Sequence, residues 1–138
     1  MSYKIVIVPF LALIIAQIIK VILDARKGEF SWGNLNRYGG MPSSHSAMVA
    51  ALCVEIGMAT GFNSAYFAIA LAFSFLIVRD AVGLRRNLGK HGKILNMLIK
   101  DLPDYKENKY PFLEERLGHT YWQALVGILL GIIIALLI

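Results

Sequence analysis

The segment Gly39–Ala47 reads GGMPSSHSA and places His45 directly after two serines, at the start of an apolar stretch. A second histidine, His119, lies in the segment LGHT before the last apolar stretch. Two histidines can divide a phosphoryl transfer, because a neutral imidazole attacks phosphorus while a protonated one donates to the leaving oxygen. The ordinary histidine pKa of about 6.5 makes both forms accessible near neutral pH. The pair therefore indicates phosphoryl transfer, if the fold brings the two side chains together.

Groups that could bind the phosphate stand at the ends of the same apolar stretches. Guanidinium groups bind phosphate through paired hydrogen bonds, and the free N–H groups of a helix start add to them. Because these cations already offset the charge of the transferred group, we expect a site that needs no metal. The expected phosphate-binding residues are Lys20, Ser43, Ser44, Arg79, Arg85 and Arg86.

Four apolar stretches must position these groups, and each is near the roughly 20 residues that cross a bilayer. Of the 138 residues, 57% are hydrophobic and only 17% are charged, which is too little charge for an ordinary soluble domain. We expect one all-α domain over residues 1–138, an integral membrane helical bundle with about four transmembrane spans. A soluble bundle of very apolar helices is the less favoured alternative. The stretches are Ile5–Leu23, Ser46–Thr60, Ala65–Val78 and Tyr121–Ile138.

The distribution of the 14 lysine and arginine residues predicts the orientation. Four spans place both termini and the short Gly61–Ser64 link on one face, where Lys4 is the only basic residue. The others lie on the opposite face or, for Lys20, near its edge, which the positive-inside rule makes cytoplasmic. We expect a protein of the cell inner membrane whose site faces the cytoplasm and membrane lipids. Nucleic acid is not an expected partner, because no basic segment is interleaved with exposed aromatic residues.

Two further stretches have helical patterns. Between Arg79 and Leu102, apolar residues recur at helical spacing among lysines, which predicts a cytoplasmic amphipathic helix on the membrane surface or against the bundle. Gly127 and Gly131 form a GxxxG pair, which is typical of close helix packing, either within the chain or in a homodimer. Trp32 and Tyr38 are expected at the level of the lipid headgroups, and residues 103–112 as a loop.

Other polar residues receive structural interpretations. Cys53, the only cysteine, is expected as a small buried side chain. Glu55 is ionisable within an apolar stretch but lies far along it from His45, so we expect a structural hydrogen bond. His91 receives no catalytic role.

Two alternatives to an enzyme with a histidine nucleophile remain. The protein could be a non-catalytic phospholipid-headgroup binder or an assembly subunit that pairs through its GxxxG glycines. Alternatively, His45, His91, His119 and Asp80 could bind a metal, although no two of the histidines are four residues apart as on one helix face.

The segments GGMPSSHSA, RDAVGLRRNLGK and LGHT, with Asn96 and Gly127–Gly131, resemble the divergent branch of the type 2 phosphatidic acid phosphatase superfamily. These are small integral membrane proteins related to acid phosphatases and vanadium haloperoxidases. The resemblance covers nearly the whole chain, from Gln17 to the end. It implies hydrolysis of a phosphomonoester or diphosphate on a lipid, without a cofactor.

The broader superfamily carries the motifs K-x6-R-P, P-S-G-H and S-R-x5-H-x3-D. By position, Lys20 matches the first lysine, Pro42–His45 match the second motif, and His119 matches the histidine of the third. The resemblance thus implies that His119 forms a phosphohistidine and that His45 protonates the leaving group.

This chain departs from those motifs at several positions. Lys27 and Gly28 replace the arginine and proline of the first motif, and Ser44 replaces the glycine of the second. Leu113 stands where the third motif has arginine, so Arg79, Arg85 or Arg86 would have to replace it. Gln123 stands at the aspartate position. A glutamine can orient the His119 ring but cannot stabilise an imidazolium by charge, so Asp80 is the alternative orienting residue.

Overall fold

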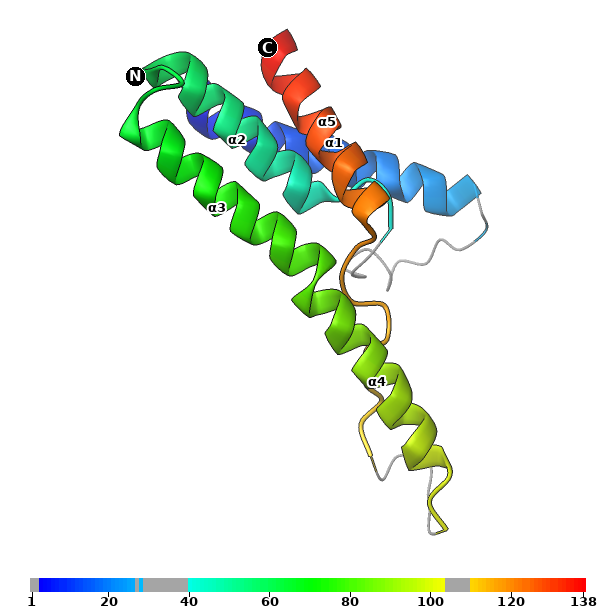
Figure 1. Cartoon of the computed structure of the whole chain (residues 1–138). Coiled ribbons are helices and arrows are strands. Elements are labelled where there is room, and N and C mark those ends of the chain that lie inside the picture. The colour runs from blue at the N-terminus through cyan, green and yellow to red at the C-terminus, as the bar shows by residue number, and fades with distance from the viewer. Residues whose placement is uncertain (1–2, 27, 29–39, 104–109) are drawn as a thin grey trace.

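The computed structural model describes residues 3–26, 28, 40–103 and 110–138, and the predictions for Trp32 and Tyr38 lie outside them. All regular structure in these residues is helical, which confirms the all-α prediction. The helices are α1 (Lys4–Arg26), α2 (Ser44–Thr60), α3 (Ala65–Val82), α4 (Leu84–Lys100) and α5 (Tyr121–Leu137), as Figure 1 shows.

Side-chain oxygens start three of these helices. Ser43, Ser64 and Thr120 are the N-caps of α2, α3 and α5, and each accepts a hydrogen bond from a backbone N–H of the first turn. The expected stretches correspond to α1, α2, α3 and α5 with small differences at their ends. Pro42 lies just before the N-cap of α2 and follows a cis peptide bond. Ser43 is the N-cap, and Ser44 is the first residue of α2.

Helix α2 is the centre of the bundle, because α1, α3 and α5 all pack against it. The buried core is made largely of alanines such as Ala12, Ala16, Ala47 and Ala51, which let the helix backbones approach closely. A Cβ on Gly131 would collide with the carbonyl oxygen of Ala47. The close packing expected of the GxxxG pair is therefore found within the chain, between α2 and α5. A homodimer stays a prediction and would need another surface.

The outer surface of the bundle is strongly apolar. Large side chains such as Phe10, Ile14, Phe73 and Leu129 are about half exposed or more. Soluble monomers rarely expose apolar surface this continuous, whereas lipid contact requires it. Two helical stretches are long and apolar enough to cross a membrane, Lys4–Arg26 and Ala65–Lys100, and α2 and α5 are shorter apolar helices.

Helix α4 continues the direction of α3 beyond the bundle (Figure 1). The backbone leaves helical geometry at Gly83, so the amphipathic helix begins at Leu84 rather than at Arg79. Among the described helices, α4 contacts only α3, and it therefore does not pack along the bundle. Its large apolar side chains, including Leu88, Leu95 and Leu98, are exposed.

The described ends of the chain lie next to each other. The Lys4 side-chain amine donates a hydrogen bond to the backbone carbonyl of Ile138, and Figure 1 shows both ends at the same end of the bundle. This is the arrangement that an even number of membrane crossings requires.

Candidate active site

A small cavity lies where α3 ends and α5 begins. Its polar lining comes from His45 on α2, Asp80 on α3, Arg85 on α4 and His119 in the segment before α5. Ile77, Ala81 and Gly118 complete the wall. The volume is about 70 Å³, roughly twice the volume that one water occupies in the liquid. Three regions that are distant in the sequence, at residues 45, 80–85 and 119, thus bring two imidazoles, a guanidinium and a carboxylate to one cavity.

Backbone contacts set the position of His119. Its N–H donates a hydrogen bond to the carbonyl oxygen of Ala81 at 2.9 Å, in the last turn of α3. The preceding residue, Gly118, has a φ of 79°, which side-chain-bearing residues rarely adopt. A Cβ on Gly118 would also collide with the backbone of Arg86. The glycine therefore allows the chain to pass close to the α3–α4 junction and to deliver His119 there.

A second set of backbone and cap contacts positions His45. The Ser43 N–H donates to the carbonyl oxygen of Gln123 at 3.1 Å, which joins the starts of α2 and α5. The Ser43 hydroxyl is fully buried and accepts from the Ser46 hydroxyl at 2.9 Å. His45 follows in the first turn, where the backbone N–H groups have no partner within the helix. The start of α2 thus presents both an imidazole and backbone donors.

The environment of His119 favours its neutral form. Burial lowers the pKa of His119 below 6.5, because desolvation disfavours the charged ring. Polar contacts with the Gly40 backbone and the Gln123 side chain raise the pKa by less, while the charge of Lys20 lowers it further. The buried Nδ1 atom has no hydrogen-bond partner among the described residues. A neutral imidazole is the form that a nucleophile requires.

Lys20 supplies a buried positive charge next to the cavity. Its side chain is only 8% exposed, and a Cβ on Gly40 would touch its methylene groups. It lies close enough to His45 and His119 to interact electrostatically with both. Arg85 also interacts with His45 in this way. A phosphate in the cavity would therefore meet at least two cations.

The two residues expected to orient His119 have other partners. The Asp80 carboxylate accepts a hydrogen bond from Nε of Arg85 at 2.6 Å. The Gln123 side-chain oxygen accepts from the Thr120 N–H at 2.8 Å and so closes a capping box at the start of α5. In this structure Asp80 holds an arginine, whereas Gln123 both stabilises the start of α5 and contacts the His119 side chain.

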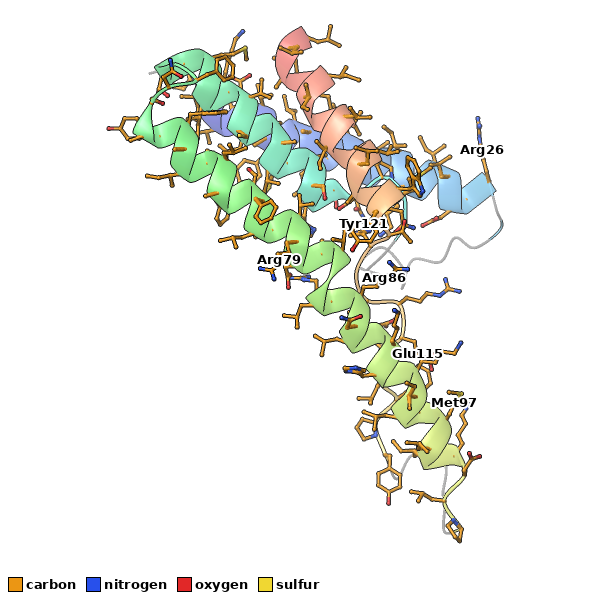
Figure 2. All side chains as sticks on the ribbon, in the orientation of Figure 1. Arg26, Arg79, Arg86, Met97, Glu115 and Tyr121 are labelled. Carbon is orange, nitrogen blue, oxygen red and sulfur yellow. The ribbon has the colours of Figure 1, made fainter. Side chains whose placement is uncertain are left out.

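The remaining predicted phosphate ligands differ in position. Ser43 is buried in the α2–α5 contact, and its hydroxyl serves the cap. Ser44 is half-buried as the first residue of α2. Figure 2 shows Arg79 on the side of α3 that faces away from α5. Arg86, on α4, instead lies on the side that faces the chain segment leading to α5. Of the three arginines considered for the missing motif position, Arg85 alone lines the cavity.

A return segment, residues 110–118, runs antiparallel along α4 to the cavity. The Asn96 amide nitrogen donates to the Leu113 carbonyl at 2.8 Å and to the Glu115 carboxylate at 2.9 Å. The Leu113 N–H donates back to the Asn96 side chain at 3.0 Å. Gly89 and Gly92 let the return segment lie directly on the helix, because a Cβ on either would collide with its carbonyl oxygens. The sequence analysis named Asn96 as part of the family resemblance but predicted no role for it.

The structure also places the residues of the alternative metal site. His91 is exposed on α4 and does not line the cavity. Across residues 3–26, 28, 40–103 and 110–138, no three His, Cys, Asp or Glu side chains group closely enough to hold a metal ion. Cys53 is buried, as predicted. Glu55 is also buried, but its Oε1 atom makes no hydrogen bond with any residue that the structure describes, so the expected bond is not found there.

Comparison with known proteins agrees with this description. The family model described as "Divergent PAP2 family" matches residues 1–134. A protein of Bacillus subtilis (strain 168), named "Uncharacterized membrane protein YuiD", is 36% identical over 142 residues, which cover 90% of this chain and 89% of that protein. No solved structure matches the chain. The membrane designation of the relative agrees with the two helical stretches that could cross a bilayer.

Proposed function

Because the chain belongs to the divergent PAP2 family, we propose that it is a phosphatase for a phosphorylated lipid in the cytoplasmic leaflet of the cell inner membrane. In this proposal α1, α2, α3 and α5 each cross the membrane. The cavity then lies at the cytoplasmic ends of the helices, with most of the basic residues. The observation that carries the proposal is the cavity that His45 and His119 line together with Arg85.

The first half of the proposed reaction transfers the phosphoryl group to the protein. A neutral nitrogen of His119 attacks phosphorus, and an N–P bond forms as the P–O bond to the lipid breaks. Protonated His45 donates its proton to the leaving oxygen, which departs as the lipid alcohol. Arg85 and Lys20 offset the negative charge on the transferred group, the role that a cation would otherwise need to fill.

The second half releases phosphate. His45, now neutral, accepts a proton from water, whose oxygen attacks phosphorus while the N–P bond to His119 breaks. Inorganic phosphate leaves and both histidines return to their starting forms. A lipid suits this site better than a soluble phosphate ester, because its hydrocarbon part can stay in the bilayer while the headgroup reaches the cavity.

Phosphate release from lipid phosphates tests this proposal. Purified protein in detergent, with a chelator present, is given phosphatidate, phosphatidylglycerophosphate and prenyl phosphates. We expect release from at least one of them, inhibition by vanadate, and losses of about 10²-fold or more in His119→Ala and His45→Ala. His91→Ala, which removes the exposed histidine of α4, is the matched control and keeps full activity. Full activity in His119→Ala would reject the assignment of the nucleophile.

Trapping of the intermediate separates the two histidine roles. With a lipid labelled in its phosphate, wild-type protein should carry a label that is labile to acid and stable to base, and His119→Ala should carry none. His45→Ala should retain the label longer than wild type when the leaving group is a good one, because water activation is lost.

Two observations favour a non-catalytic alternative, in which the protein only binds phosphate headgroups. Nδ1 of His119 has no hydrogen-bond partner among the described residues, and the position that carries aspartate in the superfamily holds Gln123. On this alternative, lipid phosphates bind wild-type protein and fail to bind Arg85→Ala, but no lipid in the panel releases phosphate.

A further inference from the structure

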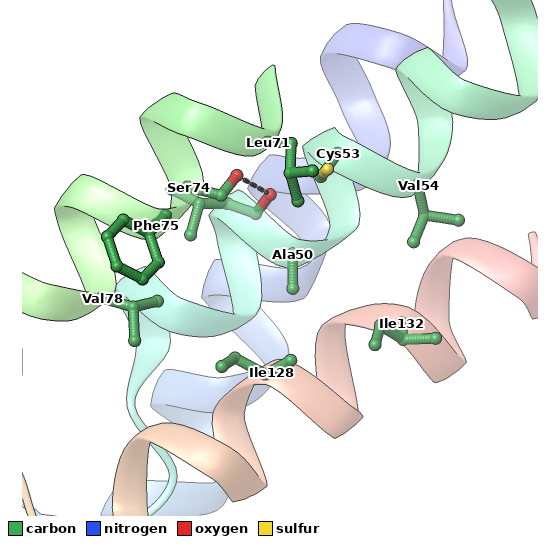
Figure 3. Close-up of a pocket in the computed structure, with 10 residues that line it drawn as sticks. Ala50, Cys53, Val54, Leu71, Ser74, Phe75, Val78, Ile128 and Ile132 are labelled. Atoms are coloured by element: carbon green, nitrogen blue, oxygen red, sulfur yellow. Dashed lines mark hydrogen bonds between the residues drawn. The ribbon is translucent and has the colours of Figure 1, made fainter. Parts of the chain in front are cut away.

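A second, larger cavity lies between α2, α3 and α5 (Figure 3). Its volume is about 290 Å³, and its lining is apolar, with Ala50, Cys53, Leu71 and Phe75 among the lining residues. The one hydroxyl in the wall, Ser74, is engaged by the backbone carbonyls of Val49 at 3.0 Å and Ala70 at 2.7 Å. The cavity therefore offers a ligand no free polar group and suits a hydrocarbon.

This apolar cavity adjoins the candidate active site. Val49, in its wall, is one helical turn after His45, which corresponds to about 6 Å along α2. On α3, Val78 lines the apolar cavity while its neighbour Ile77 lines the polar one. A ligand that fills both would have a polar end at the two histidines and an apolar remainder that begins one turn away.

The arrangement of α3 and α5 explains why a cavity exists here. Both helices pack on α2 but contact each other little. Figure 1 shows that they converge where α3 ends and α5 begins, the point at which His119 bonds to Ala81, and diverge from there. The result is a wedge with α2 as its floor and the polar cavity at its narrow end. Leu71 and Phe75 at its edge are more than half exposed.

We infer that this apolar cavity holds one hydrocarbon chain of the phosphorylated lipid whose headgroup occupies the candidate active site. The inference rests on the proposed function and adds a subsite to it. An engineered apolar cavity of about 150 Å³ binds benzene, so the present volume accommodates the part of a chain nearest the headgroup. The remainder extends between α3 and α5 into the bilayer.

The subsite should act on orientation more than on affinity. A chain that moves from lipid tails to an apolar cavity leaves one hydrocarbon environment for another, so little hydrophobic free energy is gained. Fixing the chain one turn from His45 does, however, restrict the positions that the phosphorus atom can take relative to His119. Restriction of this kind raises the rate of reaction of a bound substrate.

A cavity-filling substitution tests the subsite by turnover. Ala50→Phe places a ring in the apolar cavity, whereas Ala72→Phe adds the same ring on the exposed face of α3. We expect Ala50→Phe to lower kcat/KM at least about tenfold for a long-chain lipid phosphate, and to leave a short-chain, water-soluble phosphomonoester within twofold of wild type. Ala72→Phe should change neither. The subsite is rejected if Ala50→Phe leaves the melting temperature unchanged and either lowers kcat/KM equally for both substrates or lowers it for neither.

A photocrosslinking experiment tests the subsite without turnover. Two lipids carry the same diazirine near the start of one chain, and one has a phosphate headgroup and the other phosphocholine. We expect the phosphate lipid to label the peptides that contain Val49–Val54, Leu71–Val78 or Ile128–Ile132 in preference to the phosphocholine lipid. This labelling should be lost in Ala50→Phe and kept in Ala72→Phe.

The combined outcomes separate the two proposals. Equal labelling by both lipids would mean that the cavity holds bilayer lipid in general, which overturns the substrate subsite even if phosphate release is observed. Selective labelling without phosphate release from any lipid would support the subsite for a bound headgroup and reject the phosphatase.

Discussion

The backbone N–H of His119 donates a hydrogen bond to the carbonyl oxygen of Ala81 at 2.9 Å. This single contact joins the segment just before α5 with the last turn of α3, and the two residues are 38 positions apart in the sequence. Because Ala81 follows Asp80 directly, the bond also places the backbone of His119 beside the helix end that carries Asp80. The candidate active site thus depends on a main-chain contact that no pattern of side chains reveals.

Gly118→Ala should disturb this contact. A methyl group there would collide with the backbone of Arg86, and the φ of 79° adds strain of about 1–3 kcal/mol for a residue with a side chain. We expect loss of phosphate release and a lower melting temperature. Gly61→Ala is the matched control, because Gly61 also has a positive φ, of 90°, but no atom lies within 4 Å of its added Cβ. It should lose stability from strain and keep turnover; equal turnover losses in both variants would show that the close approach at Gly118 is unimportant.

Gln123→Glu should change the pH dependence of turnover. His119 must be neutral to attack, so activity falls as pH decreases through its pKa, which burial lowers below 6.5. In wild-type protein the acidic limb of the kcat/KM profile should therefore have its midpoint below pH 6.5. A carboxylate at position 123 can still close the capping box, and its negative charge favours the protonated His119 ring. The acidic limb of the kcat/KM profile should therefore move to higher pH by about one pH unit.

The control for this shift is Tyr121→Glu, which adds the same charge at an exposed position of the same helix start. Its acidic limb should stay within a few tenths of a unit of wild type. An unchanged limb in Gln123→Glu would mean that His119 is not the group whose ionisation limits the rate at low pH.

Asn96→Ala should loosen the return segment. The substitution removes three hydrogen bonds, to the two backbone groups of Leu113 and to the Glu115 side chain. Loss of partners for buried groups costs about 1–3 kcal/mol. We expect faster hydrogen exchange over residues 110–118, faster tryptic cleavage after Arg116, and a lower kcat.

Asn87→Ala, an exposed position on the same helix, provides the comparison and should exchange and cleave like wild type. If the return segment of Asn96→Ala exchanges no faster than that of Asn87→Ala, the segment is held by the glycine contacts alone.

Gly131→Ala should weaken the packing of α5 on α2. Its methyl group would collide with the backbone oxygen of Ala47, which has little freedom to move, and overpacking of this kind costs about 1–3 kcal/mol. We expect a lower melting temperature in detergent. Leu129→Ala, on the exposed face of the same helix, removes more atoms but should melt nearly as wild type does in a matched detergent. Similar losses in both variants would contradict an intramolecular role for the glycine.

The helices could be predicted because each is determined by residues within or next to its own segment. The apolar runs gave α1, α2, α3 and α5 within a few residues of their ends, and Thr120 before the last run matches a capping residue in type and place. The break at Gly83 was missed, because a glycine inside an otherwise continuous helical pattern is also tolerated without a break.

The candidate site was predictable only in its outline. His45, Asp80, Arg85 and His119 do line one cavity, and chemistry-bearing residue types at helix ends had suggested this. The distinction between Arg79 and Arg85 could not be drawn, because it depends on how α3 turns about its axis and where Gly83 ends it. The engagement of Asp80 with Arg85 and of Gln123 with Thr120 likewise depends on side-chain geometry that the one-dimensional pattern does not contain.

Peptide groups hold both histidine positions, through the bond from His119 to Ala81 and the bond from Ser43 to Gln123. Neither bond involves an imidazole. The two reactive side chains can accordingly be replaced by thiols, amines or unnatural metal-chelating groups, because the main chain sets the spacing of the two positions. This small bundle is therefore a scaffold on which different chemistry can be designed at a membrane surface.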